Sequence, residues 1–420
     1  MKRLLLKVTA MSGLLTLLRM GMGFVIAKVV AIYTGPTGMA MLGQVQSLVG
    51  TLNGIINSPV GSGIVRYTAE KQVTGVAGYE ACAPWWKASL QWVLIILSII
   101  VPLSILFSGK ISHWLFNDSQ FDWIIVVTVI SLPLAAFGTF CNSVINGLQN
   151  YRRYILLGMI SSIVSGLVML AMIMESNLNG ALLAASVQSA LIGCVMLAGN
   201  LRQPWFKICF LWGKTRKEER TAIGRYMLMA LTSSLTMPVS LILVRNILID
   251  NVGWEAAGNW QAVWKISEVY LGVITIALST YYLPRLSSLT CGRSIVNEIN
   301  STALLIIPVV SLLAIFVYIL RDFAVLALFT KEFYHARELF LIQLCGDIVK
   351  IASWLYAYPM ISRGKTKWFI CTEIIFSVSF VLSSYLFVSY YGVNGANMAY
   401  LFSYILYFIF VVVNIKRIVN

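Results

Sequence analysis

Long apolar runs recur along the whole chain, and they limit its fold more than any other feature. Only 11% of the 420 residues are charged and 59% are hydrophobic, whereas about 25% of residues are charged in an ordinary soluble domain. A helix of about 20 apolar residues spans the roughly 30 Å of bilayer hydrocarbon. The chain is therefore predicted to be an all-α, polytopic membrane protein.

The apolar runs predict twelve transmembrane helices. The first follows a basic start, as in a signal peptide, but Arg19 interrupts its apolar run and no small-residue cleavage site follows. We therefore predict an uncleaved first helix. The predicted helices cover residues 10–33, 37–58, 87–108, 122–146, 153–174, 178–200, 226–249, 258–282, 301–320, 336–361, 367–389 and 394–415.

The distribution of basic residues predicts the topology. An even number of helices places both termini on one side, and most of the 31 Lys and Arg residues lie in the loops of that side. The opposite loops hold only Lys110, Arg321, Lys331 and Arg337. Because basic loops stay in the cytoplasm, both termini are predicted to be cytoplasmic. Basic residues in cytoplasmic loops then account for the net charge of +15, and a nucleic-acid partner is not needed to explain it.

The most basic loop divides the chain. It reads RQPWFKICFLWGKTRKEER and starts at Arg202, with aromatic residues alternating with cations. That pattern is typical of a segment lying on a membrane surface. We predict an N-terminal six-helix lobe over 1–201, a basic amphipathic cytoplasmic linker over 202–225 and a C-terminal lobe over 226–420. An anchor to anionic lipid is the role we expect for the linker, with a regulatory site as the alternative.

The two halves resemble each other weakly. At an offset of 217 residues, Lys28 matches Arg245 and Gln44 matches Gln261. Six helices per half return the chain to the same side, so the repeats should be parallel about an axis normal to the membrane. Two such lobes are expected to enclose a central cavity.

Eight charged side chains lie inside the predicted helices more than three residues from either end, although a charge at the bilayer centre costs about 2.5–3.5 kcal/mol or more. The cations are Arg19, Lys28, Arg245, Lys265 and Lys350, and the carboxylates are Glu268, Asp347 and Glu373. At helical spacing, several share a face with polar residues that we expect to line the cavity. These polar residues are Gln44, Ser47, Thr51, Gln261 and Gln343.

The charges can be interpreted in two ways. Lys265 with Glu268, and Asp347 with Lys350, could be i,i+3 pairs that neutralise each other and hold the bundle together. The other three cations have no acidic partner on their own helix, which favours a net positive cavity that binds an anion. Arg19 and Lys28 lie about 180° apart on a straight helix, so they cannot both face one cavity unless the helix bends. Because Arg19 is nearer the cytoplasm and could extend into it, we rank it below Lys28 as an anion-binding residue. The polar stripe formed by Gln44, Ser47 and Thr51 on the predicted helix over 37–58 could equally be a contact surface between helices.

No catalytic or cofactor motif is evident. The seven cysteines are scattered without a C-x-x-C pair, and two histidines cannot complete a metal site. RGKT and WGKT end like a phosphate-binding loop but lack its first glycine. We predict a transporter without cofactor or metal, driven by an ion gradient, the membrane potential or the substrate's own gradient.

Three stretches resemble one known family, and the likeness extends over essentially the whole chain. They are AKVVAIYTGPTGMAMLGQVQSL, NWQAVWKISEVYLGVITIALSTYYLPRLSSL, and LRDFAVLALFTKEF leading into LFLIQLCGDIVKIASW. These resemble the Wzx-type flippases, which include O-antigen flippases and the lipid III flippase of enterobacterial common antigen. The family belongs to the multidrug/oligosaccharidyl-lipid/polysaccharide exporter superfamily.

The resemblance implies two lobes forming a V around a central cavity in the bacterial inner membrane. It implies that an undecaprenyl-diphosphate-linked oligosaccharide moves from the cytoplasmic to the periplasmic leaflet by alternating access. Lys28, Arg245, Lys265, Lys350 and Arg19 are then candidates for binding the anionic headgroup. Asp347, Glu268 and Glu373 are candidates for coupling to H⁺ or Na⁺, because a carboxylate in a low-dielectric site can take up a proton near neutral pH. Lys265 departs from the lipid III flippases, which favours an O-antigen unit.

Four alternatives stay open at this stage. The substrate could be lipid III of enterobacterial common antigen. A multidrug antiporter of the same superfamily should have an acidic cavity, and an O-antigen polymerase or ligase should have large outer loops. A scaffold or lipid scramblase would show no ion dependence. The sugar composition of the substrate, the oligomeric state and contacts with a polymerase or chain-length regulator are not determined by the sequence.

Overall fold

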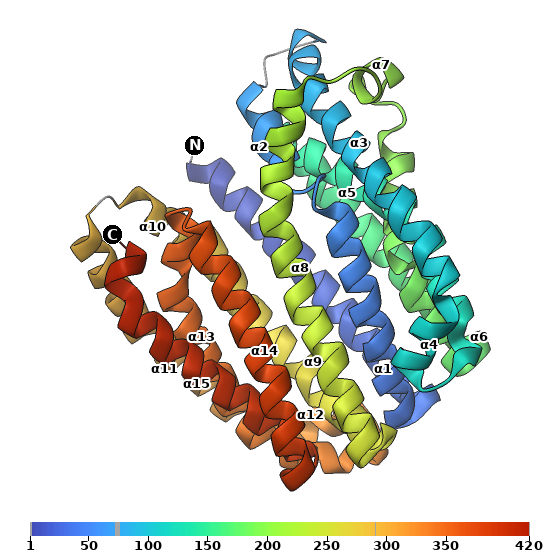
Figure 1. The fold of residues 1–420 in the computed structure, drawn as a ribbon, viewed down its shortest axis with the longest axis vertical. Helices are drawn as coiled ribbons and strands as arrows, with labels where there is room; N and C mark the ends of the chain where they lie inside the picture. Colours follow the sequence, from blue (N-terminus) through green and yellow to red (C-terminus); the bar gives the residue numbers. More distant parts are fainter. Residues whose placement is uncertain (1, 72–75, 290, 420) are drawn as a thin grey trace. The chain divides into compact units, whose positions relative to one another are not determined.

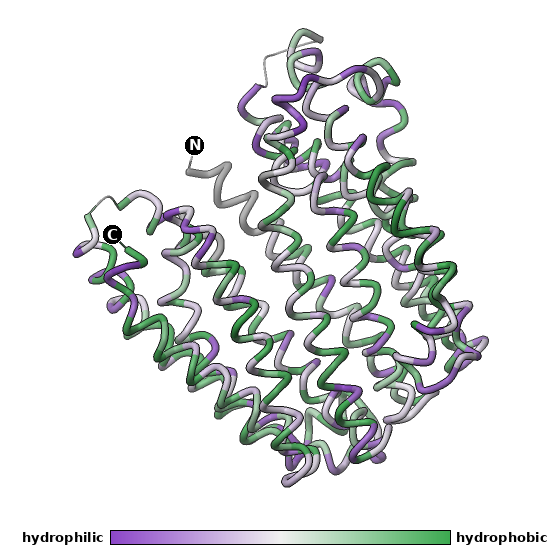
Figure 2. Tube along the Cα trace, viewed as in Figure 1, coloured by the Kyte–Doolittle hydropathy of each residue, from purple (hydrophilic) through white to green (hydrophobic). Residues whose placement is uncertain are grey.

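The computed structural model describes residues 2–71, 76–289 and 291–419, and the ordered elements of these residues are all helical. The prediction of an all-α membrane protein is confirmed. Among the described residues, nine helical segments are long and apolar enough to cross a membrane. Their apolar residues are seen along the tube in Figure 2.

Two of these nine segments are long enough for two crossings each. Helix α1 (Lys2–Asn57) has 56 residues and breaks at Gly35, and α6 (Tyr151–Asn200) has 50 residues and breaks at Ser176 and Asn177. Counting both as double and adding α9 (Trp254–Ala277), which is more polar, accounts for the twelve predicted crossings. Helices α3 (Val76–Leu106), α8 (Lys217–Val252) and α11 (Gly292–Ile319) begin earlier than predicted, because their first turns continue beyond the apolar run, where water can solvate polar side chains.

The break in α1 has a clear local cause. Gly35 takes a φ of +62°, a left-handed conformation that a side chain would strain, and Pro36 follows it. A Cβ on Gly258 of α9 would overlap the backbone of Pro36, so only glycine lets the two backbones meet so closely. The sharp turn therefore seats the segment after Gly35 against α9.

The chain divides into two compact units. Unit 1 comprises the residues up to Tyr33 together with Gln44–Pro238, and unit 2 comprises Thr34–Gly43 together with Val239–Asn420. One boundary falls inside α8 (Lys217–Val252), at the proline within that helix, and the other two fall inside α1. The predicted lobes at 1–201 and 226–420 stay a prediction.

Unit 1 is built around the packed pair α5 and α6. A Cβ on Gly138 of α5 would overlap the backbone at Gly193 of α6, so small residues bring these helices together. The buried indole of Trp86 donates to the Thr68 hydroxyl at 2.9 Å. Helix α5 spans Asp122–Gly147. Besides parts of α1 and α8, the unit also contains α2 (Ser62–Lys71), α3 (Val76–Leu106), α4 (Ser108–Phe116), the 3₁₀ turn η1 (Ser119–Phe121) and α7 (Ile208–Leu211).

Unit 2 is centred on α13, which packs against α11 and α15, while α14 packs against α15 (Figure 1). Helix α9 also contacts α13 and α15. The elements are η2 (Leu278–Tyr282), α10 (Leu283–Ser288), α11 (Gly292–Ile319), α12 (Arg321–Leu328), η3 (Lys331–Leu339), α13 (Phe340–Ser362), α14 (Thr366–Tyr391) and α15 (Val393–Val419). This packing brings the polar faces of α9, α13 and α15 together inside one unit.

Candidate functional site

A fully buried carboxylate, Asp347 of α13, lies at the centre of the polar residues of unit 2. The hydroxyl of Tyr270 on α9 donates to its Oδ2 at 2.5 Å, and the hydroxyl of Tyr400 on α15 donates to its Oδ1 at 2.8 Å. The Gln343 amide contributes a longer contact of 3.4 Å. A buried carboxylate is tolerated only when it is hydrogen-bonded or paired. Asp347 therefore joins three helices through its hydrogen bonds.

Lys350, one turn further along α13, lies among aromatic rings. Within the described part of the chain, no ion pair of 4.0 Å or less joins it to Asp347. Its ammonium instead lies 5.1–5.7 Å from the ring centroids of Trp264, Trp354, Tyr400 and Tyr404. Rings within about 6 Å attract a cation through their quadrupoles, most strongly where water is absent. We call these four rings the aromatic cage.

Two further carboxylates lie near the cage. Glu268 accepts a hydrogen bond from the Trp264 indole at 3.1 Å and pairs with Lys265 at 3.1 Å. The side chains of Lys265 and Glu268 keep 26% and 46% of their surface exposed, so this pair lies at the edge of the polar cluster. Glu373 of α14 interacts electrostatically with the ammonium of Lys350.

Arg245 is sealed inside unit 2. Only 1% of it is exposed, its Nη2 donates to Gln261 Oε1 at 2.9 Å, and its guanidinium lies 5.9 Å from the Trp260 ring. A Cβ on Gly43 would collide with both Arg245 and Gln261. The segment after the break in α1 thus covers this cation.

The formal charges of the membrane helices are distributed unevenly. Unit 2 contains three of the cations and all three of the carboxylates, so its polar cluster is balanced in formal charge. The excess positive charge comes from Arg19 and Lys28, both in unit 1. The net formal charge of +2 among these eight side chains therefore lies on the first helix.

The first-helix cations differ in their surroundings. Arg19 is exposed, and its Nε donates to the Ser162 hydroxyl of α6 at 3.3 Å. Lys28 is half-buried and lies two turns nearer the break in the helix. The structure therefore places Arg19 beside α6 of its own unit and does not bring it to Lys28.

The uncharged stripe of α1 lies in unit 1 and is mostly occupied by structural hydrogen bonds. The Gln44 amide donates to the carbonyl of Leu115 at 3.2 Å, and the Thr51 hydroxyl donates to the carbonyl of Ser47 at 2.8 Å. Gln44 and Ser47 are buried. These contacts join α1 to α4 and satisfy the hydroxyl of Thr51 within its own helix.

Sequence reasoning missed the aromatic residues of the cluster. Tyr270, Trp264 and Tyr400 make the contacts that hold Asp347, Glu268 and Lys350. One signal was present: Tyr400, Tyr404 and Tyr407 share a face of α15 at helical spacing. Rings with hydroxyl tips on one face of a membrane helix indicate a polar partner on the neighbouring helix.

Comparison with known proteins defines the class. A family model described as "Polysaccharide biosynthesis protein" matches residues 5–290, and the chain belongs to that family. The chain is 25% identical over 398 residues to proteins named lipid III flippase from Escherichia coli (strain K12) and Shigella flexneri, with 94% of each chain covered. The resemblance to the Wzx-type flippases is thereby confirmed.

Solved structures show the same fold. An inward-facing multidrug resistance transporter of the MATE family, in the MOP superfamily, aligns with a TM-score of 0.78 and 14% identity, covering 96% of this chain and 94% of that one. The lipid II flippase MurJ, in an inward closed conformation, aligns with a TM-score of 0.71 and 13% identity, covering 98% and 87%. At these identities the likeness shows the fold alone. The chain is a multi-pass protein of the inner membrane.

Proposed function

We propose that the protein is a flippase for undecaprenyl-diphosphate-linked oligosaccharide repeat units, moved from the cytoplasmic to the periplasmic leaflet by alternating access. The full-length similarity to lipid III flippases carries this proposal. The carboxylates and cations inside otherwise apolar helices support it, because intramembrane charges mark transport pathways. On this proposal the protein is a transporter and performs no catalysis.

On this proposal, each unit contributes its own charged residues. Lys28, with Arg19 nearer the membrane surface, would attract the diphosphate, since unit 1 carries the excess positive charge. Lys265 and Lys350 would add to headgroup binding from unit 2. Arg245 would contribute only in a conformation that exposes it. Asp347, Glu268 and Glu373 would couple movement to H⁺ or Na⁺, because any change in the charge of Asp347 alters the field at the neighbouring Lys350.

Transport in proteoliposomes tests the function. The wild type should move an undecaprenyl-diphosphate-linked repeat unit faster with an imposed H⁺ or Na⁺ gradient. Asp347→Asn should lose the gradient dependence, while Asp322→Asn, an exposed carboxylate of α12, should keep it. Absence of movement with any glycan would overturn the proposal, and movement without gradient dependence would indicate a scramblase.

The substrate has two candidates. Lys265 favours an O-antigen unit, because it departs from the lipid III flippases. The similarity to two proteins named lipid III flippase favours lipid III. Supplying both glycolipids in the same assay separates them, because a specific flippase should prefer one by at least about tenfold. Co-purification with a polymerase or chain-length regulator would then identify the assembly in which an O-antigen flippase works.

The cytoplasmic location of both termini is also part of this proposal. Reaction of Cys209 in α7 with a membrane-impermeant maleimide tests it, because Cys209 is exposed and lies in the basic loop. Cys209 should be labelled in inverted membrane vesicles and protected in intact spheroplasts. The reverse pattern would show that the topology is inverted.

A further inference from the structure

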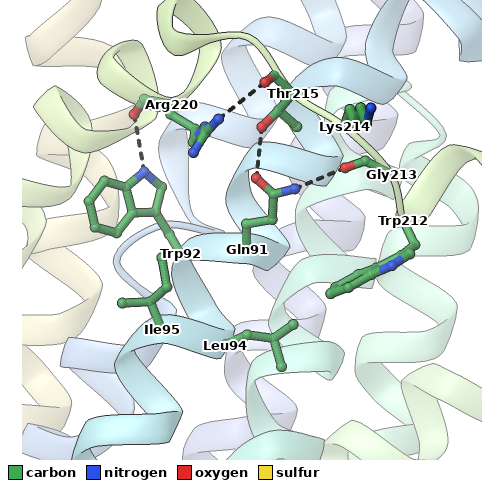
Figure 3. Close-up of a pocket in the computed structure, with 9 residues that line it drawn as sticks. All are labelled: Gln91, Trp92, Leu94, Ile95, Trp212, Gly213, Lys214, Thr215 and Arg220. Carbon is green, nitrogen blue, oxygen red and sulfur yellow. Dashed lines mark hydrogen bonds between the residues drawn. The ribbon is translucent and has the colours of Figure 1, made fainter.

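A pocket in unit 1 lies between the basic loop and helix α3, and none of the charged residues of the candidate functional site lines it. Its volume is about 700 Å³, within the usual range for small-ligand sites. The upper wall consists of the loop from Trp212 to Thr215 and Arg220 of α8, and the lower wall consists of α3 (Figure 3). The pocket is therefore built by two segments that are more than a hundred residues apart in sequence.

Hydrogen bonds hold the loop in place against α3. The Gln91 amide donates to the carbonyl of Gly213 at 2.9 Å and accepts from the Thr215 hydroxyl at 2.7 Å. The Trp92 indole donates to the carbonyl of Arg220 at 3.1 Å. Figure 3 shows these bonds converging on one turn of α3. The loop is thus a fixed part of the pocket wall.

The pocket wall changes from polar to apolar along α3. Lys87 is the last charged residue of that helix, and Gln91 and Trp92 lie about one turn further in. Leu94 and Ile95, which follow, keep 47% and 48% of their surface exposed. Because the apolar run continues from there to the end of α3, the pocket lies at the boundary between headgroups and hydrocarbon.

The charge of the upper wall has one sign. Lys214 and Arg220 line the pocket, whereas the two carboxylates of the first turn of α8, Glu218 and Glu219, do not. Among the described residues, the Arg220 guanidinium makes one hydrogen bond, from Nη2 to the carbonyl of Thr215 at 3.2 Å. Its other N–H groups are left to bind an anion, and guanidinium groups suit phosphate oxygens well.

We propose that this pocket binds the headgroup of an anionic membrane phospholipid, with its acyl chains lying against Leu94 and Ile95. Trp92 and Trp212 would lie at the level of the headgroup, where amphipathic rings are favoured. Trp212 is 58% exposed and Ile208 of the same loop is 82% exposed, as expected for side chains that enter a bilayer. A bound lipid would join α3 to the start of α8 and so act on the connection that leads from unit 1 toward unit 2. The proposal does not depend on the transported substrate.

Binding to the purified full-length protein tests this proposal. Native mass spectrometry would count phosphatidylglycerol molecules retained in detergent, with phosphatidylethanolamine as the zwitterionic comparison. The pocket variant is Lys214→Gln with Arg220→Gln. The matched control is Lys207→Gln with Arg216→Gln, which removes the same charge from exposed residues that do not line the pocket.

Wild type and control should retain phosphatidylglycerol in preference to phosphatidylethanolamine, with affinities within about twofold of each other. Each interfacial cation contributes about a fivefold factor to the attraction of an anionic lipid, so the pocket variant should bind roughly 25-fold more weakly. If the double variant does not fold by circular dichroism, Lys214→Gln alone should show about a fivefold loss.

Three results would overturn the proposal. Equal losses in the two variants would mean that the loop attracts anions diffusely. Equal retention of both lipids would mean that the headgroup charge is not recognised. Displacement of the lipid by glycerol 1-phosphate at equal concentration would mean that the pocket takes a free phosphate, not a membrane lipid.

Discussion

Removal of the Tyr270 hydroxyl is the sharpest perturbation of the polar cluster in unit 2. Tyr270→Phe deletes one oxygen and with it the 2.5 Å hydrogen bond to Asp347. The carboxylate would keep its 2.8 Å bond from Tyr400, a side-chain hydrogen bond with Ser267 and the long contact from Gln343. No other packing is lost, because the ring of phenylalanine fills the same space.

The expected loss follows from the charge of the acceptor. Hydrogen bonds to charged groups contribute about 1.5–3 kcal/mol, whereas bonds between membrane helices average about 0.6 and reach about 1.7 kcal/mol. Because Asp347 is fully buried and the bond is short, we expect a value at the overlap of these ranges. Tyr270→Phe should lower the free energy of unfolding by about 1.5–1.7 kcal/mol.

The assay is reversible denaturation in mixed micelles, followed by circular dichroism. The control is Tyr281→Phe, because Tyr281 is 69% exposed and changes at such surface positions usually stay within about 0.5 kcal/mol. The substitution is then repeated in an Asp347→Asn background. With a neutral acceptor the bond should contribute about 0.5–1.5 kcal/mol, so the cost of Tyr270→Phe should fall.

Two results would refute this reasoning. If Tyr270→Phe costs no more than Tyr281→Phe, the hydroxyl does not stabilise the native state. If it costs the same with and without the Asp347 carboxylate, the two residues are not coupled and the charge of Asp347 plays no part.

Three further predictions address the cage, the helix packing and a surface thiol. Lys350→Gln should reduce glycolipid transport at least about tenfold in proteoliposomes, because the aromatic cage loses its cation. Lys110→Gln, which removes an exposed lysine near the ring of Phe107, should not reduce it. Equal activities of the two variants would contradict this prediction. Gly193→Val should lower the free energy of unfolding by about 2–3 kcal/mol through overlap with α5. The control is Gly50→Val, because an added Cβ at Gly50 meets nothing within 4 Å; similar losses would rule out a tight contact. Hydrogen bonds from backbone amides at the start of α11 lower the pKa of the Cys291 thiol, so more thiolate is present near neutral pH. Alkylation of Cys291 by iodoacetamide should therefore reach half its maximal rate at a lower pH than alkylation of glutathione. A higher pH for Cys291 would contradict this prediction.

The membrane class and the positions of the crossings were predictable because they depend on local sequence. A run of about 20 apolar residues has few alternatives to a membrane helix. The two breaks occur at Gly35 and at Ser176–Asn177, between helices that the sequence had already separated. Helix starts were less accurate, since the first turns of α3 and α11 lie outside the apolar run.

The candidate site was only partly predictable. The charges at Lys265, Glu268, Asp347 and Lys350 were evident because they interrupt apolar helices. Their partners were not evident, because which side chains meet depends on helices far apart in sequence. Spacing alone suggested an i,i+3 pair between Asp347 and Lys350, whereas the folded chain gives the carboxylate tyrosine hydroxyls and the lysine aromatic rings.

The sequence by itself therefore determined that this is a helical, multi-pass membrane protein with charges inside its helices, because hydropathy and charge act over one helix at a time. The tertiary structure decided how those charges are satisfied. It balanced the charges of unit 2 among themselves, left the excess positive charge on the first helix and built a pocket from α3 and a distant loop. These features require the packing of separate helices, which periodicity within one helix does not specify.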